Sequence, residues 1–421
     1  MDFEPWWLII VPVLFGLGWL AARFDFRQML SETRALPDSY FKGLNFLLNE
    51  QPDRAIDAFV EVAKLDPETT ELHFALGSLF RRRGEIERAI RVHQSLLSRG
   101  DLPLPDRENA QLALAQDFLK AGMLDRAEQG FRAVLQTRHD LEALRALVRI
   151  HESEHDWDKA IDTVQQLRAR IDEPVPQLAH YHCERAQALM EARTPDFDAA
   201  AQALDAAENA VRRNGSTPAS ETRVRMLRAR WAALRGDLES QRAHLQDVLS
   251  TAPEFSGLVA QPLLDCYAAL GRAAEGLSLL REQYGRLPTL DLFNVIFRAL
   301  RATEGAVPAW AFARQALRAH PSLLGLDRLL EVELAQGGGE RAGRTAEAAP
   351  DVSPGGGGLP GEPLVPGADL GLLRSMIHKH TQRLDRYACG HCGFEARRYY
   401  WQCPGCNTWE TYRPRRLEEI R

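Results

Sequence analysis

The stretch Leu76–Ile90 has the sequence LGSLFRRRGEIERAI. The same arrangement, a glycine, then a phenylalanine and later an Arg-Ala-Ile triplet, occurs around Ala55, which lies 34 residues before Ala89. Apolar residues recur every three or four positions within each copy, which is typical of amphipathic helices. The small residues let two helices approach closely. This stretch therefore predicts a chain built from repeated pairs of helices.

A period of 34 residues is that of tetratricopeptide (TPR) repeats. Further units with looser spacing are marked by Asp125-Arg-Ala127, Asp158-Lys-Ala160, Phe197 to Ala200, Gly236-Asp, Gly271-Arg and Trp310 to Pro321. We expect a mainly α fold in which residues 38–336 form a TPR-type α-solenoid of about eight repeats with a concave face. The array contains no nucleophile elbow, phosphate-binding glycine loop or H-E-x-x-H motif, so we expect a binding scaffold and not an enzyme.

Residues 1–22 predict a transmembrane anchor. Trp6–Ala22 (WWLIIVPVLFGLGWLAA) contains no charged residue, and its seventeen residues are at the short end for a membrane span. Tryptophans lie near both of its ends, where indole rings favour the headgroup region. Arg23 and Arg27 follow it and no basic residue precedes it, which places the rest of the chain in the cytoplasm. The alternative is a cleaved signal peptide, which would begin with a basic region that this leader lacks.

Composition limits the class of protein. The chain has 421 residues, too many for one ordinary domain, and 26% of them are charged and 45% hydrophobic, as in globular proteins. A net charge of −6 argues against a protein built mainly to coat nucleic acid. Cys183 and Cys266 lie far apart and are expected to be unpaired core residues, which fits a reducing compartment. His180 and His182 alternate on a helix, so we do not expect them to form a metal site with Cys183.

A change of composition separates the repeats from the C-terminus. Residues 337–367 are rich in Gly, Pro and Ala, and we expect them to form a flexible linker because they have little apolar surface to bury. Leu370–Leu384 (LGLLRSMIHKHTQRL) then predicts a short amphipathic helix. Residues 368–421 are expected to form a small separate domain.

Four of the six cysteines form two C-x-x-C pairs near the C-terminus. They are Cys389, Cys392, Cys403 and Cys406. Two such turns facing each other supply four thiolates, the tetrahedral shell of a single zinc or iron ion. Gly393 and Asn407 follow the two pairs, and both residue types tolerate the left-handed backbone that closes such a turn. The alternatives are two disulfides or a thiol–disulfide redox pair, although a redox C-x-x-C is expected alone at the start of a helix.

The last fifty residues are basic and aromatic. Residues 372–421 contain ten Lys or Arg against five Asp or Glu, a balance of +5. Seven aromatic residues interleave with them, which can indicate nucleic-acid binding. The alternative is that so small a domain builds its own core from these rings and the metal. Arg413, Arg415 and Arg416 can also meet anionic lipid or an acidic partner.

Three stretches, in this order and behind an apolar leader, form one known pattern. They are Tyr40–Ala55, Leu76–Gln94, and the pair of segments Tyr387–Phe394 and Tyr400–Cys406. Together they resemble the bacterial lipopolysaccharide assembly protein B family, and the resemblance extends over nearly the whole chain. The linker at 337–367 looks longer than is usual in that family.

The resemblance implies a single-pass inner-membrane protein of Gram-negative bacteria, with its bulk on the cytoplasmic side. Members regulate lipopolysaccharide biosynthesis by promoting degradation of the committed-step deacetylase of lipid A synthesis, an LpxC-type enzyme, by the FtsH-type membrane protease. They are also thought to gather other lipopolysaccharide assembly factors. The terminal module is implied to be rubredoxin-like, with the four cysteines as its ligands and with iron and zinc both compatible. Two alternatives remain, a nucleic-acid-binding zinc ribbon on a TPR scaffold and a periplasmic TPR scaffold.

Overall fold

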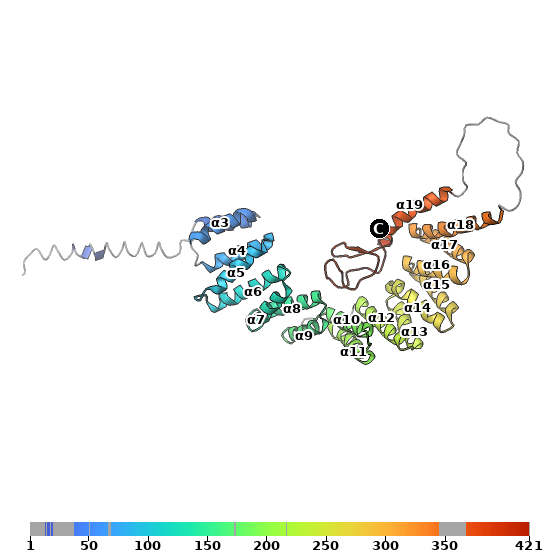
Figure 1. The fold of residues 1–421 in the computed structure, drawn as a ribbon, viewed down its shortest axis with the longest axis horizontal. Coiled ribbons are helices and arrows are strands. Elements are labelled where there is room, and N and C mark those ends of the chain that lie inside the picture. Colours follow the sequence, from blue (N-terminus) through green and yellow to red (C-terminus); the bar gives the residue numbers. More distant parts are fainter. Residues whose placement is uncertain are drawn as a thin grey trace, which may run out of the picture. The chain divides into compact units, whose positions relative to one another are not determined.

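Helices dominate the computed structural model of the chain (Figure 1). The structure describes residues 38–49, 51–65, 69–171, 174–215, 217–344 and 368–420, together with Val13, Phe15, Gly16, Gly18 and Trp19. Within these residues, consecutive helices pack against each other in pairs, and the contacts divide the chain into two compact units between Glu154 and His155.

The first unit is helical throughout its described residues. Its helices are α2 (Asp38–Leu48), α3 (Pro52–Leu65), α4 (Thr70–Arg83), α5 (Ile86–Ser98), α6 (Leu104–Lys120), α7 (Leu124–Val134) and α8 (Asp140–Glu154).

The second unit contains further repeat helices and the C-terminal module. The repeat helices are α9 (Trp157–Arg168), α10 (Gln177–Glu191), α11 (Phe197–Asn214), α12 (Pro218–Leu234), α13 (Leu238–Thr251), a 3₁₀ turn (Pro253–Phe255), α14 (Ser256–Ala269), α15 (Ala273–Arg286), α16 (Leu290–Thr303), α17 (Ala306–Ala319) and α18 (Leu323–Arg344). The module consists of α19 (Ala368–Leu384), β1 (Tyr387–Ala388), β2 (Glu395–Ala396) and α20 (Leu417–Ile420).

Packing confirms the sequence-based prediction of a mainly helical TPR solenoid. Alanines at equivalent positions of five helical repeats are completely buried, namely Ala55, Ala89, Ala127, Ala160 and Ala200. Close approach explains the glycines as well, because a Cβ atom on Gly77 of α4 would lie 2.3 Å from Nε2 of His93 in α5. The small residues are therefore required where the two helices of one repeat meet.

Aspartates start several of the second helices of the repeats. Asp156, Asp196 and Asp237 each precede a helix and accept a hydrogen bond from the backbone N–H three residues later. Such N-caps satisfy donors that have no partner within the helix, which fixes where α9, α11 and α13 begin.

Two predicted segments lie mostly outside the described residues. Most of the expected anchor at 1–22 lies there, and so do residues 345–367 of the expected linker. In the part of the chain that the structure describes, no helix combines the length and the apolar character needed to span a bilayer. Helix α18 continues to Arg344, so it includes the first residues of the segment 337–367.

Candidate metal centre and its contact with the repeats

Four cysteine sulfurs gather at one point of the C-terminal module. The Sγ atoms of Cys389, Cys392, Cys403 and Cys406 all lie within 4.8 Å of one another. Cys389 is 3.8 Å from Cys406 and Cys392 is 3.7 Å from Cys403, sulfur to sulfur. A tetrahedron with metal–sulfur bonds of about 2.3 Å has edges of about 3.8 Å, whereas a disulfide requires about 2.05 Å. The donor set therefore fits one metal ion bound by four thiolates.

The two turns have the backbone that the sequence predicts. Gly393 has φ +76° and Asn407 has φ +55°, so the residue after each pair is left-handed. Backbone N–H groups point at the sulfurs: His391 donates to Sγ of Cys389 over 3.4 Å, and Gly405 donates to Sγ of Cys403 over 3.4 Å. These donors stabilise thiolates before any metal binds.

Short pairings hold the two turns together. Strands β1 and β2 pair antiparallel, with Tyr387 opposite Ala396. An isolated bridge joins Cys389 to Tyr412, and a second joins Gln402 to Trp409. We call the segment Tyr387–Tyr412 the knuckle. Its second turn carries two of the four sulfurs, and Trp401, Trp409 and Glu410, which contact the repeats, lie on either side of this turn.

Trp409 is the main contact between the knuckle and the repeats. Its ring lies on the imidazole of His180 in α10, with centroids 4.8 Å apart and planes 10° apart. Trp157 and Tyr181 surround the same indole at 6.2 and 6.0 Å. Trp409 is 9% exposed, so an aromatic residue of a small surface domain is almost fully buried in the repeats.

A polar chain runs beside this stack. Arg223 donates from Nη1 to Nδ1 of His180 over 3.1 Å, and Nε2 of His180 lies 2.6 Å from a carboxylate oxygen of Glu410. Because guanidinium is only a donor, Nδ1 must accept, and the proton of the neutral ring therefore lies on Nε2 and is donated to Glu410. Thr217 donates to the same oxygen over 2.7 Å.

The environment shifts the pKa values of His180 and Glu410. Burial lowers the pKa of His180, and the charge of Arg223 acts in the same direction. Burial alone would raise the pKa of Glu410, but the hydrogen bonds from His180 and Thr217 hold it below its usual range. Glu410 also has φ +57°, a left-handed conformation that is uncommon for glutamate and that occurs here at the residue reaching the repeats.

A second indole extends the contact along the repeats. Trp401 stacks on Phe255, with centroids 5.9 Å apart and planes 20° apart. Arg223, 3% exposed, lies 5.7 Å from the Trp401 ring and 5.5 Å from the Trp409 ring. One buried arginine therefore contacts both tryptophans, a favourable cation–π arrangement.

Asp291 of α16 binds the other side of the module. It accepts a hydrogen bond of 2.5 Å from the hydroxyl of Tyr387 and bonds of 2.8 and 2.6 Å from Arg416. The Arg416 guanidinium also lies 4.0 Å from the centre of the Tyr387 ring. Burial raises the pKa of Tyr387 well above its usual value, and the Asp291 charge adds to this. The phenol is therefore a permanent donor to Asp291.

Two adjacent glutamates of α20 cap two repeat helices. Glu419 accepts from the backbone N–H of Leu290 at the start of α16 over 3.0 Å. Glu418 accepts from the N–H groups of Leu323 and Leu324 at the start of α18, the latter over 3.3 Å. Each carboxylate meets the positive end of a helix dipole, which stabilises the contact. Burial nevertheless raises the pKa of Glu419.

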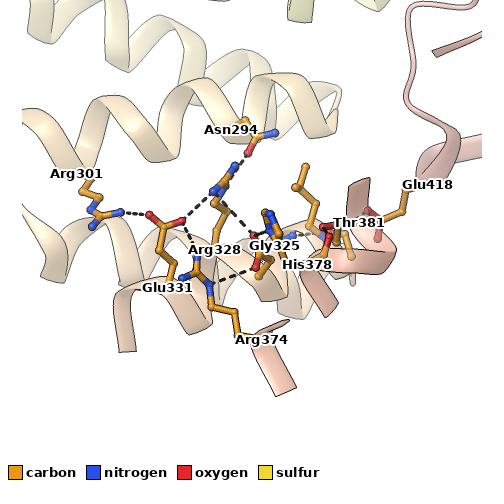
Figure 2. A network of polar contacts seen from close by, with 12 residues as sticks. Asn294, Arg301, Gly325, Arg328, Glu331, Arg374, His378, Thr381 and Glu418 are labelled. Atoms are coloured by element: carbon orange, nitrogen blue, oxygen red, sulfur yellow. Dashed lines mark hydrogen bonds and ion pairs between the residues drawn. The ribbon is translucent and has the colours of Figure 1, made fainter. Parts of the chain in front are cut away.

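Helix α19 is bound to α18 by ion pairs (Figure 2). Asp327, whose side chain is 1% exposed, lies 3.3 Å from Nε of Arg374 and 3.3 Å from Nδ1 of His378. Glu331 lies 3.3 Å from Arg374 and also pairs with Arg301. This network fixes which face of α19 is turned toward the repeats.

The structure shows where the aromatic, basic and cysteine residues singled out from the sequence lie. Tyr387, Tyr399 and Tyr412 pack with Cys389 and Cys403 in the core of the module, as the small-domain interpretation expects. Trp401 and Trp409 instead pack on the repeats. Arg416 pairs with Asp291 of the same chain. Cys183 is completely buried, and burial raises its pKa to about 11, which fits an unreactive core thiol.

The contact residues on the repeats were missed by sequence reasoning. Sequence reasoning weighs His180 only as a metal ligand and gives no role to Arg223. The one local signal was a set of polar residues, including Arg223, at helix positions where apolar residues are expected.

Two family models match parts of the chain. The rubredoxin metal binding domain matches residues 387–414, and the tetratricopeptide repeat matches residues 42–101. A solved structure, the C-terminal part of a TPR repeat-containing protein from Cytophaga hutchinsonii, is 14% identical, covers 57% of this chain and 94% of its own, and has a TM-score of 0.38.

Two curated proteins are similar over nearly their whole length. Lipopolysaccharide assembly protein B of Escherichia coli (strain K12) is 30% identical over 409 residues, which cover 96% of this chain and 97% of that protein. The protein of the same name from Haemophilus influenzae is 26% identical over 418 residues, with coverage of 96% and 97%. Because it combines TPR repeats, a four-cysteine knuckle and this similarity over nearly its whole length, the chain belongs to the lipopolysaccharide assembly protein B family.

Proposed function

We propose that this protein is a membrane-anchored adaptor that limits lipopolysaccharide synthesis. In this proposal residues 1–22 hold it in the inner membrane with the repeats in the cytoplasm. It brings an LpxC-type deacetylase to an FtsH-type membrane protease, which degrades the enzyme, and it gathers other lipopolysaccharide assembly factors. The observation that carries the proposal is the similarity to lipopolysaccharide assembly protein B, which extends over 96% of the chain.

The repeats supply a binding scaffold in this proposal. Stacked TPR helices present extended surfaces for other proteins. A tether to the membrane raises the effective concentration of the bound enzyme near a membrane protease, so a modest affinity is enough for delivery. The adaptor itself then performs no reaction.

The knuckle has a structural role in the proposal. Its four sulfurs would hold one iron or zinc ion, and the ion would fix the fold of the small module. A shell of four protein thiolates leaves no position for a substrate. The chain's own residues then do the remaining work: Trp409 and Glu410 hold the module on α10, and Glu418 and Glu419 hold it on α16 and α18.

The half-life of the deacetylase tests the proposal. Cells depleted of the protein would receive the wild-type chain, a form lacking residues 1–22, or a form in which an unrelated single-span anchor replaces residues 1–22. We expect depletion to lengthen the half-life several-fold. Both anchored forms should restore the short half-life, and the form without an anchor should not.

Each part of the proposal can fail separately. An unchanged half-life after depletion would reject the role in degradation. Full restoration by the form lacking residues 1–22 would reject the need for a membrane anchor. Restoration only by the native anchor would show that residues 1–22 make specific contacts beyond tethering.

A further inference from the structure

One face of helix α19 contacts acidic residues of α18. Arg374 and His378 point toward α18, where they meet Asp327 and Glu331 (Figure 2). Thr381, 3% exposed, lies on the same side. These contacts fix the rotation of the helix, so the opposite face is turned away from Asp327 and Glu331, and its edge borders a cavity shared with Leu323 at the start of α18.

The opposite face carries apolar residues first and basic residues afterwards. Leu372 is 63% exposed and Met376 is 58% exposed, and Lys379 and Arg383 follow on the same face and are also exposed. The spacings of four, three and four residues place these side chains in one stripe. Leu373, 47% exposed, widens the apolar end.

A shallow cavity adjoins the basic end of this stripe. Its volume is about 600 Å³. It is lined by Leu323, Met376, Lys379, His380, Arg383 and Leu384. Three of these residues are apolar and three are basic or can become so, and none of the lining residues is acidic. One of the cations is shared, because Arg383 lies 3.4 Å from Glu395.

The order along the helix favours a membrane over a protein partner. Seven residues separate Met376 from Arg383, about 10 Å at 1.5 Å per residue. A helix that enters a bilayer surface by its apolar end, to the depth of about 5–10 Å typical of interfacial helices, places its first apolar side chains among the acyl chains and its later cations at the phosphates. A protein interface instead surrounds its apolar centre with polar residues on all sides.

The charge of the C-terminal module also favours a membrane as the partner of this stripe. The whole chain has a net charge of −6, but residues 372–421 carry ten basic residues against five acidic ones. Arg374 and Arg416 pair with acidic residues of the repeats, so attraction to an anionic lipid surface rests on the exposed cations of the stripe, Lys379 and Arg383.

We propose that α19 is a second membrane contact, in which Leu372, Leu373 and Met376 enter the bilayer and Lys379 and Arg383 bind anionic phospholipid headgroups. The inference rests on the proposed membrane location. It adds that the C-terminal module, and not the anchor alone, lies on the membrane surface.

Photo-crosslinking of the full-length chain in lipid nanodiscs tests this. The photoreactive residue p-benzoylphenylalanine would replace Met376, or Gln382 as a control, since Gln382 is also exposed on α19 but lies off the stripe. Nanodiscs would contain phosphatidylcholine alone or with one third phosphatidylglycerol. We expect phospholipid adducts at position 376, at least threefold more with phosphatidylglycerol, and few at position 382. Lys379→Gln with Arg383→Gln should remove the dependence on phosphatidylglycerol.

The outcomes separate this inference from the proposed function. Insertion of residues 1–22 is checked on the same nanodiscs by resistance to extraction with alkaline carbonate. If the anchor inserts but position 376 gives no lipid adduct, or no more than position 382, α19 is not a membrane contact. Equal yields with both lipids would reject the role of the cations. Adducts to another protein in intact cells, in place of lipid, would assign the stripe to a protein partner. If the anchor does not insert, it is the proposed membrane location that fails.

Discussion

Trp409 and His180 lie face to face, with ring centroids 4.8 Å apart and planes 10° apart. Trp409 is the third residue after Cys406, so the turn that supplies two of the four sulfurs also supplies the main contact with the repeats. Glu410, the next residue, bonds to the same histidine. The fold of the metal turn and the position of the module on α10 are therefore linked.

Replacing Trp409 with alanine should loosen the contact of the knuckle with α10. A buried tryptophan contributes about 3 kcal/mol, and its loss also exposes His180 to water. We expect faster hydrogen exchange in residues 399–412 and in α10, measured by mass spectrometry on the full chain, with repeat helicity unchanged. Tyr400→Ala is the control, because Tyr400 belongs to the knuckle but is 38% exposed. Equal exchange in the two variants would contradict a contact centred on Trp409.

Acid should weaken the same contact in two stages. Burial lowers the pKa of His180 below its ordinary 6.5. As pH falls through 6.5, the histidine of the released knuckle therefore binds a proton more readily than the histidine of the docked knuckle. Docking loses stability as a result. The pKa of Glu410 is held below 4.5, so its contribution, present above 4.5, is lost as pH falls further. Arg223 and Glu184 also lie beside His180, and the charge of Arg223 lowers the pKa of His180 further.

Fluorine NMR can follow this release directly. The chain would be labelled with 5-fluorotryptophan, and the Trp409 signal assigned from Trp409→Phe. We expect this signal to move toward its exposed position between pH 7 and 5. His180→Gln should flatten that change. His182→Gln is the control: burial lowers the pKa of His182 to about 4, so it affects stability over a similar range, but the Trp409–His180 stack remains. A pH response that persists in His180→Gln would assign it to another group.

The repeats and the four cysteines could be predicted because their signals are local. Ala55 and Ala89 share a period, and each C-x-x-C pair is closed by its own left-handed residue. The contact between them could not be predicted in this way. His180 and Glu410 are 230 residues apart, and neither belongs to a motif.

Arg416 shows why charge patterns alone mislead. Its cluster of arginines at the C-terminus indicated an external anionic partner, but Arg416 meets Asp291 of the same chain. Nothing in the spacing of residues distinguishes an internal carboxylate from an external phosphate. The choice depends on where the repeats place Asp291, which is a property of the whole stack.

Removing two of the cysteines should remove the metal and spare the repeats. Cys389→Ser with Cys392→Ser leaves two thiolates, too few for a stable four-coordinate site. We expect the purified chain to lose one equivalent of metal by elemental analysis while far-ultraviolet circular dichroism keeps its helical signal. Cys266→Ser is the control, since Cys266 is buried in α14 and donates to the carbonyl of Leu238. A double variant that retained a full equivalent of metal would disprove the assignment of ligands.

Gly77 should be indispensable to the first unit. An added Cβ would lie 2.3 Å from Nε2 of His93, which is completely buried and bound through Nδ1 to Asp117 over 2.5 Å. Moving His93 away from the added methyl group would strain that bond, so Gly77→Ala should cost about 1–3 kcal/mol. Hydrogen exchange of α4, α5 and α6 would measure the loss as more frequent local opening. Gly100→Ala is the matched control, because nothing lies within 4 Å of its Cβ position, and it should change the opening free energy by less than about 0.5 kcal/mol. Equal effects of the two substitutions would mean that α4 and α5 separate easily, which is incompatible with a close contact at Gly77.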